Sequence, residues 1–151
     1  MSRHSKNGNV DRHIKNVGNY GMEFKVVKEN KTVYGKMITA NCIAYELMDS
    51  LSEEEFEVMH ALLGDDCFNF KTFTAKAVCQ DSDKFNPEVG MNIAEAKMRA
   101  KDHAWRQGIY KNAVQKLSKL ATKLEELDDR HYRKETAIRH DFNEYYCGGK
   151  T

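Results

Sequence analysis

Hydrophobic and polar residues alternate with a period of two near the start of the chain, as in a half-buried β-strand. Met22, Phe24 and Val26 carry this pattern, and a polar turn at residues 29–31 follows it. We expect a second strand after the turn. Gly21 to Ala40 is therefore predicted to form a β-hairpin.

The middle of the chain carries a helix-start signal. Ser52 to Glu55 match a capping box, in which the serine and glutamate side chains satisfy each other's backbone N–H groups. Gly64 is expected to end this helix. Residues 42–51, just before it, fit either the end of a strand or a short helix. The apolar face of the predicted helix is formed by Phe56, Met59, Leu62 and Leu63.

A strand, an acidic loop and a helix start follow one another in the second half of the chain. The strand is predicted from Phe68 to Gln80, a stretch rich in β-branched and aromatic residues. The loop ends with Asn86 at the expected N-cap and Pro87 at the first helical position. One face of the strand carries Phe73, Ala75, Ala77 and Cys79.

The C-terminal part of the chain is compatible with a single long helical region. From Pro87 to Tyr146 only Gly90 and Gly108 interrupt the helix formers, and we expect a bend at Gly108. Apolar residues recur there at alternating spacings of four and three, so we expect a homo-oligomer, either a dimer or a trimer of dimers. A monomer with this helix packed on the sheet is the alternative. The apolar positions are Tyr110, Val114, Leu117, Ala121, Leu124, Ile138, Phe142 and Tyr145.

These patterns together predict an α+β fold. It contains a small antiparallel β-sheet, a capped helix and a long C-terminal helical region that packs as a helical hairpin or as a coiled coil in an oligomer. With 151 residues the chain is expected to form one domain overall. Its parts are a basic N-terminal arm at residues 1–19, an α+β core at 20–107 and a helical region at 108–151. The arm alone has the composition of a disordered segment.

Charge is unevenly distributed, although the net charge is only +1. Residues 37–70 contain eight acids and no Lys or Arg, whereas residues 97–123 contain eight basic residues and a single acid, Asp102. No signal peptide precedes the core, and no segment has the ~18 apolar residues that a membrane span needs. We therefore expect a protein of a reducing cytosol with free thiols at Cys42, Cys67, Cys79 and Cys147.

The helix start and the basic helix make phosphate-bearing partners the first hypothesis. A strand that runs into a helix N-terminus leaves backbone N–H groups able to bind an anion. Arg99 and Arg106 are seven residues apart, on nearly one helix face, where they could clamp a phosphate. Phe85 would either staple the first helical turn or stack on a base. Asn92 would either be exposed or hydrogen-bond a base, ribose or phosphate. For the basic helix as a whole, a solvated face is the alternative.

Sequence motifs for other chemistry are missing. The chain has no C-x-x-C or H-x-x-x-H pair, no G-x-S-x-G sequence, and no Walker or Rossmann glycine pattern. We therefore expect no catalytic residues, no bound metal and no cofactor.

The segment from Asp81 to Ala94, DSDKFNPEVGMNIA, resembles a loop and helix found in small bacteriophage proteins. With the chain length, the acidic central helix and the long helical C-terminus, it is similar to the Thoeris anti-defence sponge family. This resemblance covers residues 22–146. It implies a non-enzymatic phage protein, located in the host bacterial cytoplasm, that sequesters a cyclic ADP-ribose-type or cyclic oligonucleotide signal made by TIR-domain enzymes. It also implies oligomers of α+β subunits, with a ligand site at Phe85, Met91, Asn92, Arg99 and Arg106.

Two other functions stay open. A phage accessory protein could inhibit another protein through its acidic helical region and its basic arm. A nucleic-acid-binding module is disfavoured, because the isoelectric point is near 7.7 and the acidic block would repel a polyanion.

Overall fold

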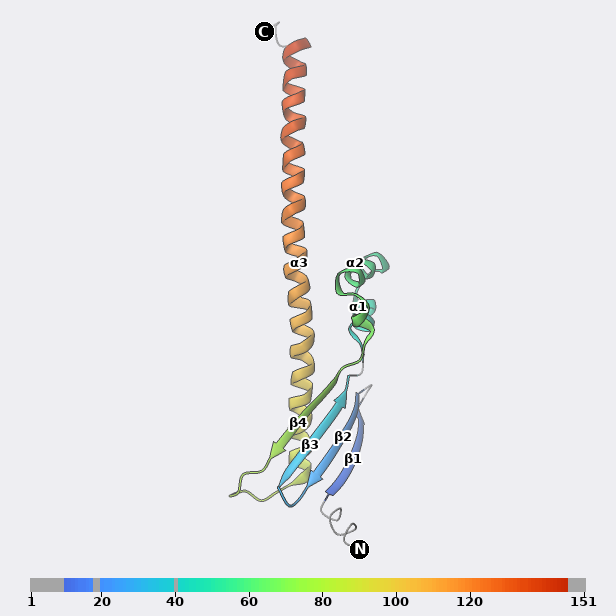
Figure 1. The fold of residues 1–151 in the computed structure, drawn as a ribbon, viewed down its shortest axis with the longest axis vertical. Coiled ribbons are helices and arrows are strands. Elements are labelled where there is room, and N and C mark those ends of the chain that lie inside the picture. Colours follow the sequence, from blue (N-terminus) through green and yellow to red (C-terminus); the bar gives the residue numbers. More distant parts are fainter. Residues whose placement is uncertain (1–9, 18–19, 40, 147–151) are drawn as a thin grey trace. The chain divides into compact units, whose positions relative to one another are not determined.

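A computed structural model describes residues 10–17, 20–39 and 41–146. The chain divides into two compact units, Met1–Ile109 and Tyr110–Thr151. The first unit holds all the strands and short helices, and the long helix α3 begins in it (Figure 1). The elements are β1 (Val10–Val17), β2 (Tyr20–Val27), β3 (Thr32–Ile38), α1 (Ile43–Ser50), α2 (Glu53–Leu63), the 3-10 helix η1 (Asp65–Phe68), β4 (Thr72–Val78) and α3 (Pro87–Tyr146).

The four strands form one antiparallel sheet in the order β1-β2-β3-β4. The predicted hairpin is confirmed, because β2 pairs with β3 across a turn that contains Lys31 in a left-handed conformation. The sheet and its helices confirm the predicted α+β class. The strand expected at residues 68–80 is shorter than predicted, because Asp65–Phe68 forms η1 instead.

Part of the predicted basic arm forms a strand. Residues 10–17, which we assigned to a disordered arm, form β1 and pair along their whole length with β2. Cross-strand pairing supplies the backbone hydrogen bonds that this polar segment could not make alone. Residues 1–9 of the predicted arm lie outside the described residues.

The acidic segment forms a compact group of helices. The region that fitted either a strand end or a helix is helical and forms α1. The capping box of α2 is confirmed, since the Ser52 backbone N–H donates to Glu55 Oε1 at 2.9 Å and the Glu55 N–H donates to Ser52 Oγ at 3.2 Å. These two hydrogen bonds lower the pKa of Glu55. Gly64 ends α2 with a φ of 77°, as expected.

The core lies between the sheet and the first part of α3. Its fully packed residues come from β2, β3, β4 and α3, namely Met22, Phe24, Val26, Val33, Met37, Phe73, Ala77, Ala94 and Met98. Two glycines let α3 approach β3 closely. A Cβ on Gly90 would lie 2.6 Å from Val33 Cγ2, and a Cβ on Gly35 would lie 2.7 Å from Met98 Cε. Glycine is required at such an approach because a larger residue would push the two elements apart.

Helix α3 is continuous from Pro87 to Tyr146 and passes through Gly108 without a break in helical structure. Within the described residues it does not fold back into a helical hairpin. A single glycine costs a helix only ~1 kcal/mol, which a long helix tolerates. Coiled-coil packing with a second chain stays a prediction. In the described part of the chain, no helix combines the length and the apolar character required to cross a bilayer.

We predict opposite effects for alanine at two helical glycines. Gly90→Ala should destabilise the fold by ~1–2 kcal/mol, because the new methyl meets the stiff, β-branched Val33. Gly108→Ala should stabilise it by up to ~1 kcal/mol, because nothing described lies within 4 Å and alanine is the better helix former. Urea denaturation of both variants measures the difference. Equal effects would show that α3 does not pack on β3 as described.

Candidate ligand-binding surface

The sheet has one covered face and one open face. Side chains on alternate positions of β2 and β3 pack against α3, and those between them are exposed. The pairing register extends this division to β1 and β4, because residues directly opposite each other share a face. The exposed face therefore collects residues from all four strands.

A tyrosine lies between two lysines on the open face. Arg12, Lys25, Tyr34 and Lys76 are cross-strand neighbours in one row, one from each strand. Adjacent strands lie ~4.8 Å apart, so the row brings together residues that are up to 64 positions apart in sequence. Tyr34 is 42% exposed. The neighbouring row is Ile14, Glu23, Lys36 and Thr74.

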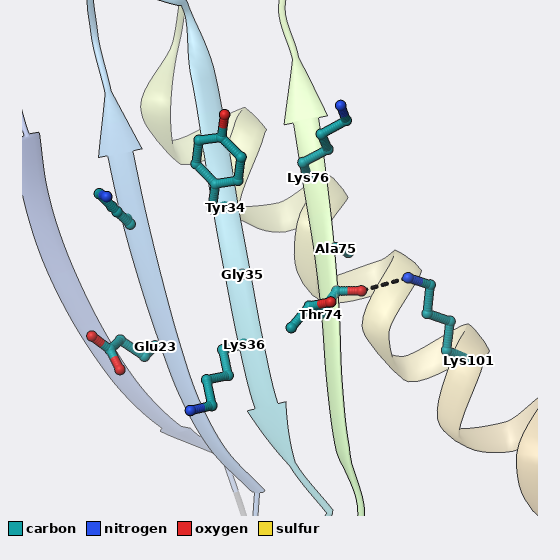
Figure 2. A pocket seen from close by; sticks show the side chains of 9 residues that line it. Glu23, Tyr34, Gly35, Lys36, Thr74, Ala75, Lys76 and Lys101 are labelled. Carbon is teal, nitrogen blue, oxygen red and sulfur yellow. Dashed lines mark hydrogen bonds between the residues drawn. The ribbon is translucent and has the colours of Figure 1, made fainter.

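Residues of β2, β3 and β4 from these two rows line a shallow hollow of about 480 Å³. Figure 2 shows the Tyr34 ring and the Lys36 and Lys76 chains above the strands, with Lys101 of α3 at the rim. Four lysines and one carboxylate line the hollow, which gives a local charge of +3 (Lys25, Lys36, Lys76, Lys101, and Glu23 as the acid). Arg12 lies outside the hollow, beside Lys25 in the same row. The four cations on the strands are Arg12, Lys25, Lys36 and Lys76. None of them forms an ion pair or a side-chain hydrogen bond with any residue that the structure describes.

Two lysines of α3 cover the free edge of the sheet. Lys97 Nζ donates to the carbonyl oxygen of Lys76 at 2.9 Å, and Lys101 Nζ donates to that of Thr74 (Figure 2). These carbonyl groups lie on the side of β4 that no strand occupies. Lysines at an edge strand discourage pairing with another chain. The edge is therefore blocked, and the open face is the accessible surface of the sheet.

The helix start of α3 gives little support to the anion site that we expected. Asn86 is the N-cap, as predicted, and its Oδ1 accepts from the backbone N–H groups of Glu88 at 3.0 Å and Val89 at 3.4 Å. The N–H of Gly90 donates to the Asn86 carbonyl oxygen at 3.0 Å, and Pro87 has no N–H. The N–H groups of residues 88–90 thus have partners inside the protein, which does not favour phosphate binding there.

The predicted ligand residues at the start of α3 lie in two different hollows. Phe85 is half-buried against the core and lines a hollow of about 320 Å³ beside Val89 and Ile93. Met91 and Asn92 line another, of about 220 Å³, together with His13, Lys15, Phe24, Glu88 and Glu95. The structure therefore does not bring Phe85 and Asn92 together. Phe85 packs against the core cluster, and the expected staple is not formed because the N4 position is Gly90, which has no side chain.

The two predicted phosphate-binding arginines are engaged within the protein. Arg99 is half-buried and lies 3.4 Å from Glu95, one turn earlier in α3. Arg106 is only 6% exposed; its guanidinium donates to Asp102 at 3.0 Å, to Glu46 of α1 at 2.8 Å and to the carbonyl oxygen of Asn41. This commitment of Arg106 does not favour a role as a phosphate clamp. It joins α1 to α3 instead.

Other chemistry has little support in the described part of the chain. No group of three or more His, Cys, Asp or Glu side chains there is placed to hold a metal ion. Burial, followed by the neighbouring Cys42 thiol, raises the pKa of Cys67, and a protonated thiol is a poor nucleophile.

Sequence reasoning missed the open face. The alternation of residues 22–27 placed Lys25 opposite the apolar positions, and the same holds for Lys76 in the later strand. That signal identified a polar face on each strand, but it did not show which residues of the other strands lie beside it. Tyr34 gave no signal of its own, because only the pairing register places it between the two lysines.

Comparison with models of protein families, with curated proteins and with solved structures finds no match to this chain. The resemblance to the Thoeris anti-defence sponge family is therefore neither supported nor contradicted, and it stays a prediction.

We predict that Arg106 is a structural residue. Arg106→Met should destabilise the fold by ~3–5 kcal/mol, because it leaves the fully buried Asp102 carboxylate without its cation. The double variant Arg106→Met with Asp102→Leu should be more stable than the single variant, since no buried charge remains. Arg99→Met is the matched control, and the loss of its half-exposed pair should cost under ~1 kcal/mol. Equal costs in urea denaturation for Arg106→Met and Arg99→Met would contradict this role.

Proposed function

We propose that this protein is a non-enzymatic binder of a nucleotide-type ligand, and that the open face of its sheet is the binding surface. The observation that carries the proposal is the row in which the exposed Tyr34 lies between Lys25 and Lys76, with Arg12 beyond Lys25. The four sheet cations, these three and Lys36, have no internal partner among the described residues. They are available to a ligand, whereas Arg99 and Arg106 of α3 are engaged within the protein.

The chemistry of the row matches the two parts of a nucleotide. An exposed tyrosine ring offers a stacking surface for a base of any kind. Lysine and arginine side chains on both sides of the ring bind phosphate groups. Because the cations come from different strands of a rigid sheet, their spacing is fixed before the ligand binds, which lowers the entropic cost of binding.

This ligand chemistry has two possible sources, a single-stranded nucleic acid and a free cyclic nucleotide. The open face favours the first, because small-molecule sites usually bury most of the ligand in a cleft. The acidic block, which we expected to repel a polyanion, lies mainly on α1, α2 and η1 and adds no carboxylate to the open face. The resemblance to sponge proteins favours the second source, a cyclic ADP-ribose-type signal whose capture would keep a TIR-dependent effector inactive.

The predicted homo-oligomer belongs to the same proposal. Several copies would present several basic faces in one particle. Linked faces raise the apparent affinity for a strand that is long enough to reach two of them.

The proposal is tested by two binding assays on the purified full chain. Fluorescence anisotropy measures binding of labelled single-stranded RNA and DNA of about 12 nucleotides, within the usual range of site sizes. Thermal shift measures binding of cyclic ADP-ribose isomers and of cyclic di- and trinucleotides, each checked for intact recovery after denaturation. At least one of these ligands should bind.

Variants of the open face should lose this binding. Tyr34→Ala should weaken it about tenfold or more, because stacking contributes ~1–3 kcal/mol per base, whereas Tyr34→Phe should keep it. Lys25→Glu with Lys76→Glu should weaken it further and flatten the salt dependence, which for a single strand on about four cations has a slope near −3. Lys119→Glu, an exposed charge reversal in the second unit, is the matched control.

The outcomes are distinct. Loss of oligonucleotide binding in the open-face variants supports a nucleic-acid ligand, and loss of cyclic-ligand binding supports a signal ligand at the same surface. Binding that is lost in Phe85→Ala or Asn92→Ala but kept in Tyr34→Ala would overturn the surface assignment. A flat response to every ligand would overturn the proposal and favour protein binding, for which α1, α2 and η1 expose Tyr45, Met48, Val58 and Phe68, and Phe70 is exposed just after η1.

A further inference from the structure

The second unit presents an apolar stripe along a single helix. From Tyr110 onwards α3 is the only element of this unit in the described residues. Three leucines there are about half exposed, namely Leu120 at 52%, Leu124 at 57% and Leu127 at 44%. A contiguous run of exposed leucines is typical of a surface that another helix covers.

The leucines define a heptad seam more clearly than the one expected from sequence. Leu117, Leu120, Leu124 and Leu127 are spaced by three, four and three residues, which is the a and d pattern of a coiled coil. The pattern continues forwards to His131, which makes two heptads, or about 22 Å of helix. It does not extend backwards, because Ala113 is only 3% exposed and is not open to a partner helix. The expected seam shares Leu117 and Leu124 with it. However, the expected seam meets Asp128 at a core position, whereas this one meets only apolar residues up to Leu127.

Charges beside the seam distinguish parallel from antiparallel packing. With leucine at a and d, the g positions are Lys116, Lys123 and Arg130, and all three are cationic. An antiparallel pair places g beside g of the partner, so every such register would oppose cations to cations. A parallel, in-register pair places g beside the e position of the following heptad in the partner.

The e positions complement those cations in the parallel arrangement. Lys123 meets Asp128 of a second copy, and Arg130 meets Glu135. Symmetry doubles each contact, which gives four attractive pairs and no repulsive one; the remaining g residue, Lys116, meets an alanine. Glu135 also contacts Arg139 of its own helix at 2.7 Å, with both side chains more than half exposed, so its carboxylate can accept from both cations.

We infer that the stripe from Leu117 to His131 binds a second copy of this chain as a parallel, in-register coiled coil. The inference deepens the homo-oligomer of the proposed function by naming the seam, the orientation and the charge pairs. It does not depend on which ligand the sheet binds. The seam ends near Lys134, because this residue occupies a d position and a parallel pair would place the two lysines beside each other.

Disulfide trapping tests the orientation in the full chain. Leu120→Cys and Leu124→Cys are made separately in a background with Cys79→Ser and Cys147→Ser, and Glu126→Cys, on the outer side of the helix, is the control. Each leucine variant alone should form a covalent dimer under mild oxidation, because identical residues face each other in a parallel pair. A covalent dimer that forms only when the two leucine variants are mixed would show antiparallel packing and overturn the inference.

Charge reversal tests the register without removing an apolar contact. Asp128→Lys with Glu135→Lys should weaken self-association at least tenfold in analytical ultracentrifugation, and so should Lys123→Glu with Arg130→Glu. Mixing the two double variants should restore association as a heterodimer. Lys119→Glu should change nothing. A monomeric wild-type chain would overturn both the inference and the homo-oligomer, while the ligand assays would still decide the function of the sheet.

Discussion

The close packing of α3 on β3 is the constraint on which the rest of the first unit depends. Gly35 and Gly90 let the helix approach so closely that Met98 and Val33 fill the space where their side chains would be. This contact buries one face of the sheet and assigns every strand residue to the core or to solvent. Because side chains alternate along a strand, a helix that seals one face also determines which residues are presented on the other.

The same contact determines what the charges of α3 do. Lys97 and Lys101 bind carbonyl oxygens at the edge of β4, and Arg106 binds Asp102 and Glu46. The basic segment of α3 that suggested a phosphate site thus uses several of its side chains for contacts within the protein. One residue of the acidic segment 37–70, Glu46, pairs with this helix, which the separation of acidic and basic segments along the sequence made possible. Among the described residues, the four cations of the open face form no ion pair within the protein.

Local features were predictable because each depends on a few neighbouring residues. The capping box at Ser52, the N-cap at Asn86 and the hairpin around Lys31 follow from side-chain chemistry and periodicity within one or two turns of chain. The anion site expected at the start of α3 gains no support from the structure, for an equally local reason. Asn86 Oδ1 accepts from two N–H groups of the first turn, and the sequence already indicated this N-cap.

The sequence by itself determined the elements: three strands and the turn of the hairpin, the capped helices, and a long proline-free helix with an apolar stripe. Only the tertiary structure decided which surfaces those elements share. Arg12, Lys25, Tyr34 and Lys76 lie on four strands, and no periodicity relates one strand to another. Their meeting depends on strand register and on which face α3 covers, both of which are set by packing between residues far apart in the chain.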